Sequence, residues 1–244
     1  MKKSLLSLAM GTLALGITEY VMMAILPNVS RSLHVSIPEA GHLISAYAIG
    51  VSAGAPLLVF AHKYKPKSIL LVLAAMMVAG AIISVLAPNY WVLLAARFIS
   101  GLPHGAYFGV ASIVAVRLAD KGHEAGAVSA MIAGMTIANL LGVPLATALC
   151  NSLSWRFPFV LAMVCALLVL FFIWRWVPDL EARPCESFRK QFVFLLRPAP
   201  WLILAATMLG NGGVFCWYSY VAPVLTQESG FSSASLFYLM IASG

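Results

Sequence analysis

Apolar residues run along this chain in seven long blocks that are separated by short polar segments. About 20 apolar residues, wound as an α-helix, are enough to cross a bilayer core of about 30 Å. The pattern therefore predicts seven transmembrane helices, and their boundaries lie near 5–26, 42–61, 68–86, 91–116, 126–148, 157–176 and 201–223. Ser36-Ile37-Pro38-Glu39 has the form of a capping box with proline in the first turn, so we expect the second helix to begin there.

An eighth apolar block begins near Ala234 and stops at Gly244. As a helix it would reach about 16 Å, half of the bilayer core. We therefore expect the chain to be a fragment of a longer protein, and a complete seven-helix protein is the alternative. The first block also resembles a secretory signal, because Lys2 and Lys3 precede it. It is longer than a typical signal and reaches Pro27 without a small-residue cleavage site, so we interpret it as a retained helix.

Composition agrees with a membrane protein, because 62% of the residues are hydrophobic and 9% are charged. Soluble domains carry about 25% charged residues. With the N-terminus inside, the inner segments hold twelve of the fifteen lysines and arginines and the outer loops hold two, Arg31 and Arg156. The inner residues are Lys2, Lys3, Lys63, Lys65, Lys67, Arg117, Lys121, Arg175, Arg183, Arg189, Lys190 and Arg197.

This distribution of basic residues is typical of a multi-pass protein with a cytoplasmic N-terminus. It accounts for the net charge of +7 without nucleic acid as a partner. We expect the protein to lie in the lipid bilayer of a bacterial inner (plasma) membrane. No metal-binding motif is visible, and no cofactor is expected.

Two charged residues stand deep inside predicted helices, away from the helix ends, Glu19 in the first and Arg97 in the fourth. Each lies eight positions from the outer end of its helix, at Pro27 and at Asn89, which places both about 12 Å deep. Opposite charges at one depth are tolerated best as a pair, so we expect Arg97 to be the partner of Glu19. An ionisable group in a span typically marks an ion or substrate pathway, and Glu19 is the candidate proton-carrying acid. The alternatives are a static ion pair and an acid that stays protonated.

Small residues recur at every fourth position on the fourth and fifth predicted helices, a spacing that lets helix backbones approach closely. On the fourth helix Gly101, Gly105 and Gly109 follow Arg97, and His104 lies on nearly the same face. The ladder of the fifth helix is Gly126, Ala130, Gly134, Ala138, Gly142 and Ala146. Packing explains most of these positions. His104 is either a proton relay or substrate contact, or a histidine bonded to a carbonyl, and Asn139 is expected to line a cavity.

The second and fifth predicted helices share the pattern Gly-x-Pro-Leu, at residues 54–57 and 142–145. Pro38 lies near the outer start of the second helix, and Pro56 follows it by 18 positions. Gly126 lies near the inner start of the fifth helix, and Pro144 follows it by 18 positions. The two prolines thus occupy mirrored depths in helices of opposite direction. An inverted repeat of two three-helix units produces this arrangement.

Two stretches carry a resemblance to a known family, residues 93–105 (LLAARFISGLPHG) and 134–144 (GMTIANLLGVP). They are similar to the major facilitator superfamily, and within it to the AraJ-like sugar and drug efflux permeases of the twelve-helix drug:proton antiporter group. Glu19-Tyr20 and residues 154–157 also fit that group. The resemblance implies an all-α membrane bundle with an N-terminal six-helix domain (1–176), a cytoplasmic central loop (177–200) and the start of a second six-helix domain (201–244).

The resemblance also implies roles for individual residues. Arg97 stands where the family places a membrane arginine associated with proton coupling, and Gly134, Gly142 and Pro144 stand in the motif associated with antiporters. The loop after the second helix departs from the family, because His62 replaces its acid and Lys65 its glycine. The resemblance therefore does not extend to the inner latch that this loop forms in the family.

With this resemblance, we expect a secondary transporter, not an enzyme, that moves a small molecule outward in exchange for protons. The resemblance implies a sugar or a drug as that molecule, while the residues alone leave sugars, amino acids and drugs open. We expect the full-length protein to be monomeric. The predicted substrate-lining residues are Tyr47, His104, Phe108, Asn139, Asn211 and Trp217. Two alternatives are a receptor-like or non-transporting seven-helix protein and an intramembrane serine hydrolase, for which Ser100 and His104 are four positions apart but lack a nucleophile signature.

Overall fold

Long helices make up most of the computed structural model, which describes residues 2–58, 63–182, 193–232, 235 and 238–239. The long helices are α1 (Lys2–Leu33), α2 (Ile37–Gly54), α4 (Pro66–Leu86), α5 (Tyr90–Leu118), α6 (Glu124–Ile137), α7 (Val143–Ser152), α8 (Phe157–Trp176) and α10 (Pro198–Ser219). The short helical turns are η1 (Ala55–Leu57), η2 (Ala138–Gly142), η3 (Val193–Leu196), α11 (Val221–Pro223) and η4 (Val224–Glu228).

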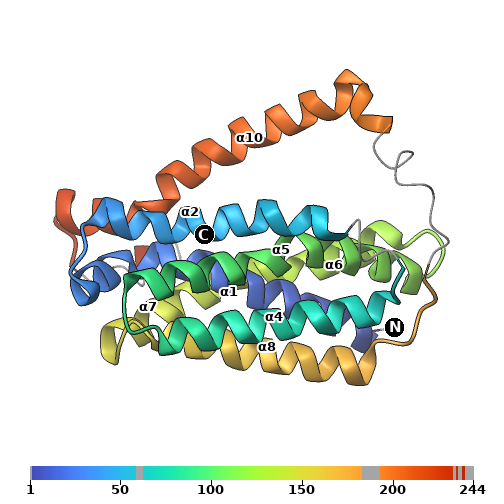
Figure 1. Cartoon of the computed structure of the whole chain (residues 1–244), viewed down its shortest axis with the longest axis horizontal. Coiled ribbons are helices and arrows are strands. Elements are labelled where there is room, and N and C mark those ends of the chain that lie inside the picture. Colours follow the sequence, from blue (N-terminus) through green and yellow to red (C-terminus); the bar gives the residue numbers. More distant parts are fainter. Residues whose placement is uncertain (1, 59–62, 183–192, 233–234, 236–237, 240–244) are drawn as a thin grey trace.

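Each of the seven predicted spans coincides with a helix or a helix pair. In the described residues six helices are long and apolar enough to cross a membrane, with α6 to α7 counted as one. The remaining predicted span corresponds to α2, which passes into η1 and runs alongside α5 (Figure 1). His62, with the rest of residues 59–62, and most of the block that begins at Ala234 lie outside the described residues.

Local chemistry sets where two of the helices begin. The predicted capping box is present, because the Ser36 backbone N–H donates to Glu39 Oε2 at 2.7 Å and the Glu39 N–H donates to Ser36 Oγ at 3.3 Å. The side chain of Asn89 caps α5 in a related way, accepting from the Val92 N–H at 3.0 Å. Both caps satisfy N–H groups that a helix start leaves without partners.

The helix pairings follow the symmetry of an inverted repeat. The helix α2 packs on α5, and its counterpart α6 packs on α1. Likewise α4 packs on α5, its counterpart α8 packs on α1, and α4 and α8 pack on each other. Exchanging spans one to three (α1, α2 and α4) with spans four to six (α5, α6 to α7, and α8) maps this set of pairs onto itself, as such a repeat requires. The Gly-x-Pro-Leu segments take equivalent roles, since Gly54 lies against Leu102 of α5 and Gly142 against Ile17 of α1.

The predicted packing glycines lie where backbones meet. A Cβ atom at Gly101 would collide with the Tyr47 carbonyl oxygen, and one at Gly134 would collide with the Ala9 carbonyl oxygen. A Cβ at Gly105 would lie 3.1 Å from the Ala55 side chain. Gly126, at the start of the second ladder, has open space around it, so packing does not explain that position.

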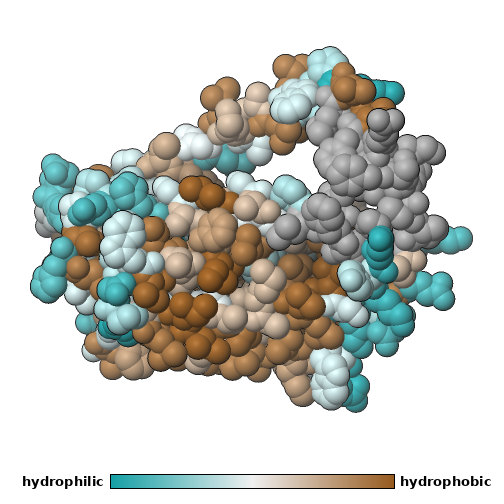
Figure 2. Space-filling view, in the orientation of Figure 1, coloured by the Kyte–Doolittle hydropathy of each residue, from teal (hydrophilic) through white to brown (hydrophobic). Residues whose placement is uncertain are grey.

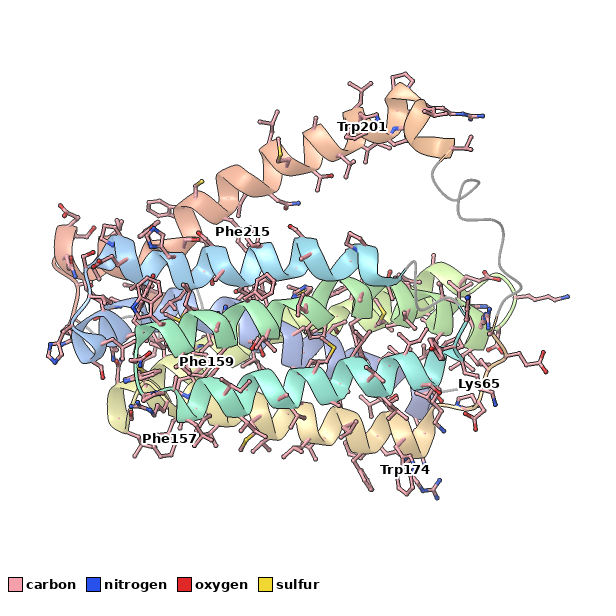
Figure 3. The ribbon with its side chains drawn as sticks, viewed as in Figure 1. Lys65, Phe157, Phe159, Trp174, Trp201 and Phe215 are labelled. Atoms are coloured by element: carbon pink, nitrogen blue, oxygen red, sulfur yellow. The ribbon has the colours of Figure 1, made fainter. Side chains whose placement is uncertain are left out.

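The surface has the polarity of a membrane protein. Figure 2 shows a brown apolar band across the middle of the bundle, with hydrophilic residues gathered at its two ends. The start of α1, the connection before α4 with Lys65, and the end of α8 with Trp174 lie at one end, and Phe157 lies at the other (Figures 1 and 3). The predicted inner basic segments in the described part of the chain thus share one end of the bundle.

The helix α10 stands apart from the other helices. It slopes across α2 and approaches the bundle at its C-terminal end (Figure 1). From Trp201 to Val214 it is exposed throughout, whereas Tyr218 is buried against α1 and η2, and α11 packs on α1. The division of the chain into two domains with a loop at 177–200 stays a prediction.

Candidate functional site

Arg97 is the largest fully buried side chain in the described structure, with 1% of its surface exposed. It reaches from α5 towards both α1 and α2. Its Nη1 donates to the Thr18 carbonyl oxygen at 2.7 Å and its Nε donates to the Leu43 carbonyl oxygen at 3.3 Å. The guanidinium carbon lies 4.4 Å from the centre of the Tyr47 ring, a cation–π contact. In the described part of the chain, Nη2 is buried without a hydrogen-bond partner.

Glu19 lies one residue beyond the carbonyl that Arg97 binds. Its side chain is 17% exposed, and Oε2 is buried with no hydrogen-bond partner among the described residues. The structure therefore brings Glu19 and Arg97 to the same depth, as predicted, but does not join them directly. Among the described residues, the nearest basic side chain to the Glu19 carboxylate is His104, whose Nε2 lies 3.9 Å from Oε2, and no Arg97 nitrogen lies within 4.0 Å of the carboxylate.

His104 connects the acid to Tyr47. Its Nδ1 lies 2.7 Å from the Tyr47 hydroxyl, and its ring stacks on Phe108 with centroids 5.3 Å apart. When the Tyr47 hydroxyl donates to Nδ1, the ring proton sits on Nε2, which faces Glu19. Within the described part of the chain, His104 is therefore bonded to a side chain and not to a backbone carbonyl. Four predicted site residues, Glu19, Tyr47, Arg97 and His104, meet in one buried cluster, and Phe108 packs on its edge.

Close helix contacts make this cluster possible. Gly101 brings α5 against the backbone of α2 at Tyr47, so the Tyr47 ring reaches both Arg97 and His104. On the other side, Gly134 and Gly142 bring α6 and η2 against α1. Pro144 has no N–H to donate to the preceding turn, and the helix before it widens into η2. The packing glycines therefore position the chemistry and take no direct part in it.

Asn139 lies in η2 and contacts the last span. Its Oδ1 accepts a hydrogen bond from the Tyr218 hydroxyl at 2.9 Å. Tyr20, next to Glu19, packs on Phe215 and on the edge of Tyr218, each with centroids 6.1 Å apart. Figure 3 shows Phe215 on the part of α10 that approaches the bundle.

Tyr20, Phe215 and Tyr218 are residues of this site that the sequence pattern alone does not reveal. The signal available was the aromatic run at residues 215–220, but which of its members face α1 depends on how α10 docks. Asn211 and Trp217, which were predicted to line the substrate path, lie on exposed parts of α10, and Trp217 is 58% exposed. The structure does not place them in the cluster, and their role stays a prediction.

Comparison with known proteins identifies the family. Residues 8–244 match the sequence profile of the Major Facilitator Superfamily. The chain belongs to this superfamily. It is 46% identical over 245 residues to "Putative transporter AraJ" of Escherichia coli (strain K12), an alignment that covers 100% of this chain and 62% of AraJ. It is also 31% identical over 216 residues to "Probable sugar efflux transporter" of Helicobacter pylori (strain G27), covering 88% of this chain and 55% of that protein.

Solved structures agree on the fold. A bacterial homologue of the human lysosomal transporter Spinster, in an inward-facing and unoccupied conformation, superposes with a TM-score of 0.77 at 17% identity. The superposition covers 99% of this chain and 58% of that protein. At this identity the likeness concerns the fold alone. The chain thus spans less than two thirds of the length of these relatives.

Family membership also removes one of the alternatives. The relatives are transporters and not enzymes, which removes the serine hydrolase interpretation. The structure gives a physical reason, because the Ser100 hydroxyl donates to the Ala96 carbonyl oxygen at 2.8 Å, within its own helix. His104 is engaged by Tyr47 and faces Glu19, so it is not positioned as the base of Ser100.

Proposed function

We propose that this chain belongs to a secondary transporter that exports a small molecule in exchange for protons by alternating access. The observation that carries the proposal is the Glu19 carboxylate. Among the described residues, its buried oxygen has no hydrogen-bond donor, and Nη2 of the nearby Arg97 has no acceptor. A buried charge without partners is costly. Two such groups at one depth are a source of free energy that a proton or a conformational change can release.

The coupling follows from the position of Arg97. Its bond to the Thr18 carbonyl holds it one residue from Glu19. A small rotation that brings Nη2 onto the carboxylate favours the charged acid and expels its proton, and the return to Thr18 favours proton uptake. His104, bonded to Tyr47 on one side, faces Glu19 on the other and provides a path for the proton between helices.

The docking of α10 supports an alternating-access mechanism. Its C-terminal end is held against α1 and η2 by Tyr20, Phe215 and Tyr218, while the rest of the helix diverges from the bundle towards the basic end. We interpret the aromatic contacts as a closed gate and the divergent side as an open one. The positive-inside bias makes the basic end cytoplasmic, so the arrangement is inward-facing in a bacterial inner membrane with the N-terminus inside.

The chemical class of the substrate is inferred from the relatives. One of them carries the description "Probable sugar efflux transporter". We propose that a sugar or a drug of similar size binds between the cluster and α10, where His104, Phe108, Asn139 and Tyr47 offer aromatic and polar contacts. The protein then acts as a monomer with protons as its coupling ion and the lipid bilayer as its surroundings.

The test is proton movement in proteoliposomes. A pH-sensitive dye inside vesicles that hold the protein would report proton exchange when a panel of monosaccharides and lipophilic cations is added across an imposed pH gradient. We expect Glu19→Gln to abolish the substrate-dependent proton signal, because glutamine cannot titrate. Glu39→Gln, which changes an exposed acid of the α2 capping box, is the matched control and should leave the signal intact. Undiminished exchange by Glu19→Gln would contradict the proposal.

A further inference from the structure

A second polar site lies at the basic end of the bundle, away from the buried cluster. A cavity of ≈ 540 Å³ opens between the start of α1 and the end of α8 and is lined by Lys2, Lys3, Ser4, Arg175 and Trp176. The two helices are tied together there, because the Ser4 hydroxyl donates to the Trp176 carbonyl oxygen at 2.7 Å. Trp176 stacks on Phe172 with centroids 4.1 Å apart, which holds one wall of the cavity in place.

The cavity has a strong positive charge. Three of its five lining residues are cationic, and no acidic residue of the described chain lines it. None of the three cations forms an ion pair within the described part of the chain, and all three are exposed. Arginine binds phosphate oxygens with two parallel hydrogen bonds, and lysine adds point charges. The chemistry therefore suits a phosphate group.

The surface that leads into the cavity is apolar. Val164, Leu168 and Phe171 are 45%, 41% and 52% exposed, and Arg175 follows them on the same stripe of α8, because the spacings are three or four residues. Trp174, 61% exposed, points away from the bundle beside this stripe (Figure 3). A tryptophan in this position is typical of a membrane interface. A free phosphate would leave the apolar stripe unused, whereas an acyl chain would cover it.

We propose that this cavity binds the headgroup of an anionic phospholipid whose acyl chain lies along the exposed stripe of α8. The site is independent of proton coupling, since it lies on the α1–α8 pair and shares no residue with the Glu19 cluster. Basic pockets at the cytoplasmic side of membrane proteins bind such headgroups. Bound lipid would join the first and the sixth span of the bundle at the end where the two helices meet.

The experiment is native mass spectrometry of the purified protein with added lipid. The probes are phosphatidylglycerol, phosphatidylethanolamine of the same acyl chains, and glycerol 3-phosphate. The triple variant Lys2→Gln, Lys3→Gln, Arg175→Gln removes the three cations of the cavity. The matched control, Lys63→Gln, Lys65→Gln, Lys67→Gln, removes the same charge at the same end of the bundle but outside the cavity. Circular dichroism checks that both variants keep their helical content.

We expect the wild type and the control to bind phosphatidylglycerol in preference to phosphatidylethanolamine. The cavity variant should bind phosphatidylglycerol at least about tenfold more weakly, given the usual contribution of a basic residue near anionic lipid. Equal losses in both variants would show general charge attraction and overturn the site. Equal binding of the two lipids by the wild type, or displacement of the lipid by glycerol 3-phosphate, would overturn the assignment of an anionic phospholipid.

Discussion

The Tyr47 hydroxyl lies 2.7 Å from Nδ1 of His104, and this bond joins α2 to α5 within the buried cluster. The same Tyr47 ring lies under the guanidinium of Arg97. One side chain therefore fixes both the histidine that faces Glu19 and the arginine next to it. A movement of α2 relative to α5 would change the surroundings of all three ionisable groups together, which links helix packing to proton chemistry.

Replacing Tyr47 by phenylalanine tests this link. The ring under Arg97 remains, but His104 loses its buried hydrogen-bond partner, which costs about 1–3 kcal/mol. We expect Tyr47→Phe to lower the thermal stability of the purified protein and to weaken substrate-dependent proton exchange in proteoliposomes. Tyr90→Phe is the matched control, because the Tyr90 hydroxyl donates to the Glu39 carbonyl at the exposed end of the bundle. Similar losses in both variants would contradict a special role for Tyr47.

Arg97 should not tolerate lysine. A lysine keeps the charge but cannot reach the Thr18 and Leu43 carbonyls at once or stack in the same plane on Tyr47. We expect Arg97→Lys to reduce stability by roughly 3 kcal/mol, since hydrogen bonds to buried charged groups are lost. Thermal unfolding in detergent measures this effect.

Arg156 provides a control for that experiment, because it makes the same kinds of contact at the end of the bundle. It donates to the Ala87 carbonyl oxygen at 2.9 Å and lies 4.3 Å above the Trp155 ring. Arg156→Lys should cost less than 1 kcal/mol, as expected for a residue nearer to solvent. A loss at Arg156 as large as that at Arg97 would argue against burial as the cause.

The sequence was sufficient for the depth of the charged residues and insufficient for their contacts. Helical rise places Glu19 and Arg97 at one level, and that level depends only on the positions of the helix ends. Which atom Arg97 binds depends on the approach of α1 to α5, and there the Thr18 carbonyl takes the place of the carboxylate. The aromatic contacts of Tyr20 could not be predicted from the sequence for a similar reason, because they join segments nearly 200 positions apart.

Two glycines of α6, Gly134 and Gly126, allow the packing role of the glycine ladder to be tested within one helix. A Cβ at Gly134 would collide with the Ala9 carbonyl oxygen of α1, whereas a Cβ at Gly126 would meet open space. We expect Gly134→Ala to destabilise the protein by about 1–3 kcal/mol, because α1 must move away. Gly126→Ala should be neutral or stabilising by up to about 1 kcal/mol, since alanine favours helix. Thermal unfolding of the two variants in one detergent compares them, and equal shifts would contradict the packing role of Gly134.

The α2 capping box gives a dependence on pH. The Ser36 hydroxyl and the Ser36 backbone N–H hold the pKa of Glu39 below its ordinary value by bonding to the carboxylate. A lowered pKa in the folded state means that Glu39 stabilises the fold above its unfolded pKa, and that this stabilisation is lost as the pH falls through the folded pKa. We expect the difference in unfolding temperature between wild type and Glu39→Ala to be present at neutral pH and to shrink as the pH falls below about 4.3, the ordinary pKa of glutamate. Ser36→Ala removes the main hydrogen-bond donor to Glu39 and should make this difference depend less on pH. A pH-independent difference between wild type and Glu39→Ala would show that the charge of Glu39 contributes nothing to the cap.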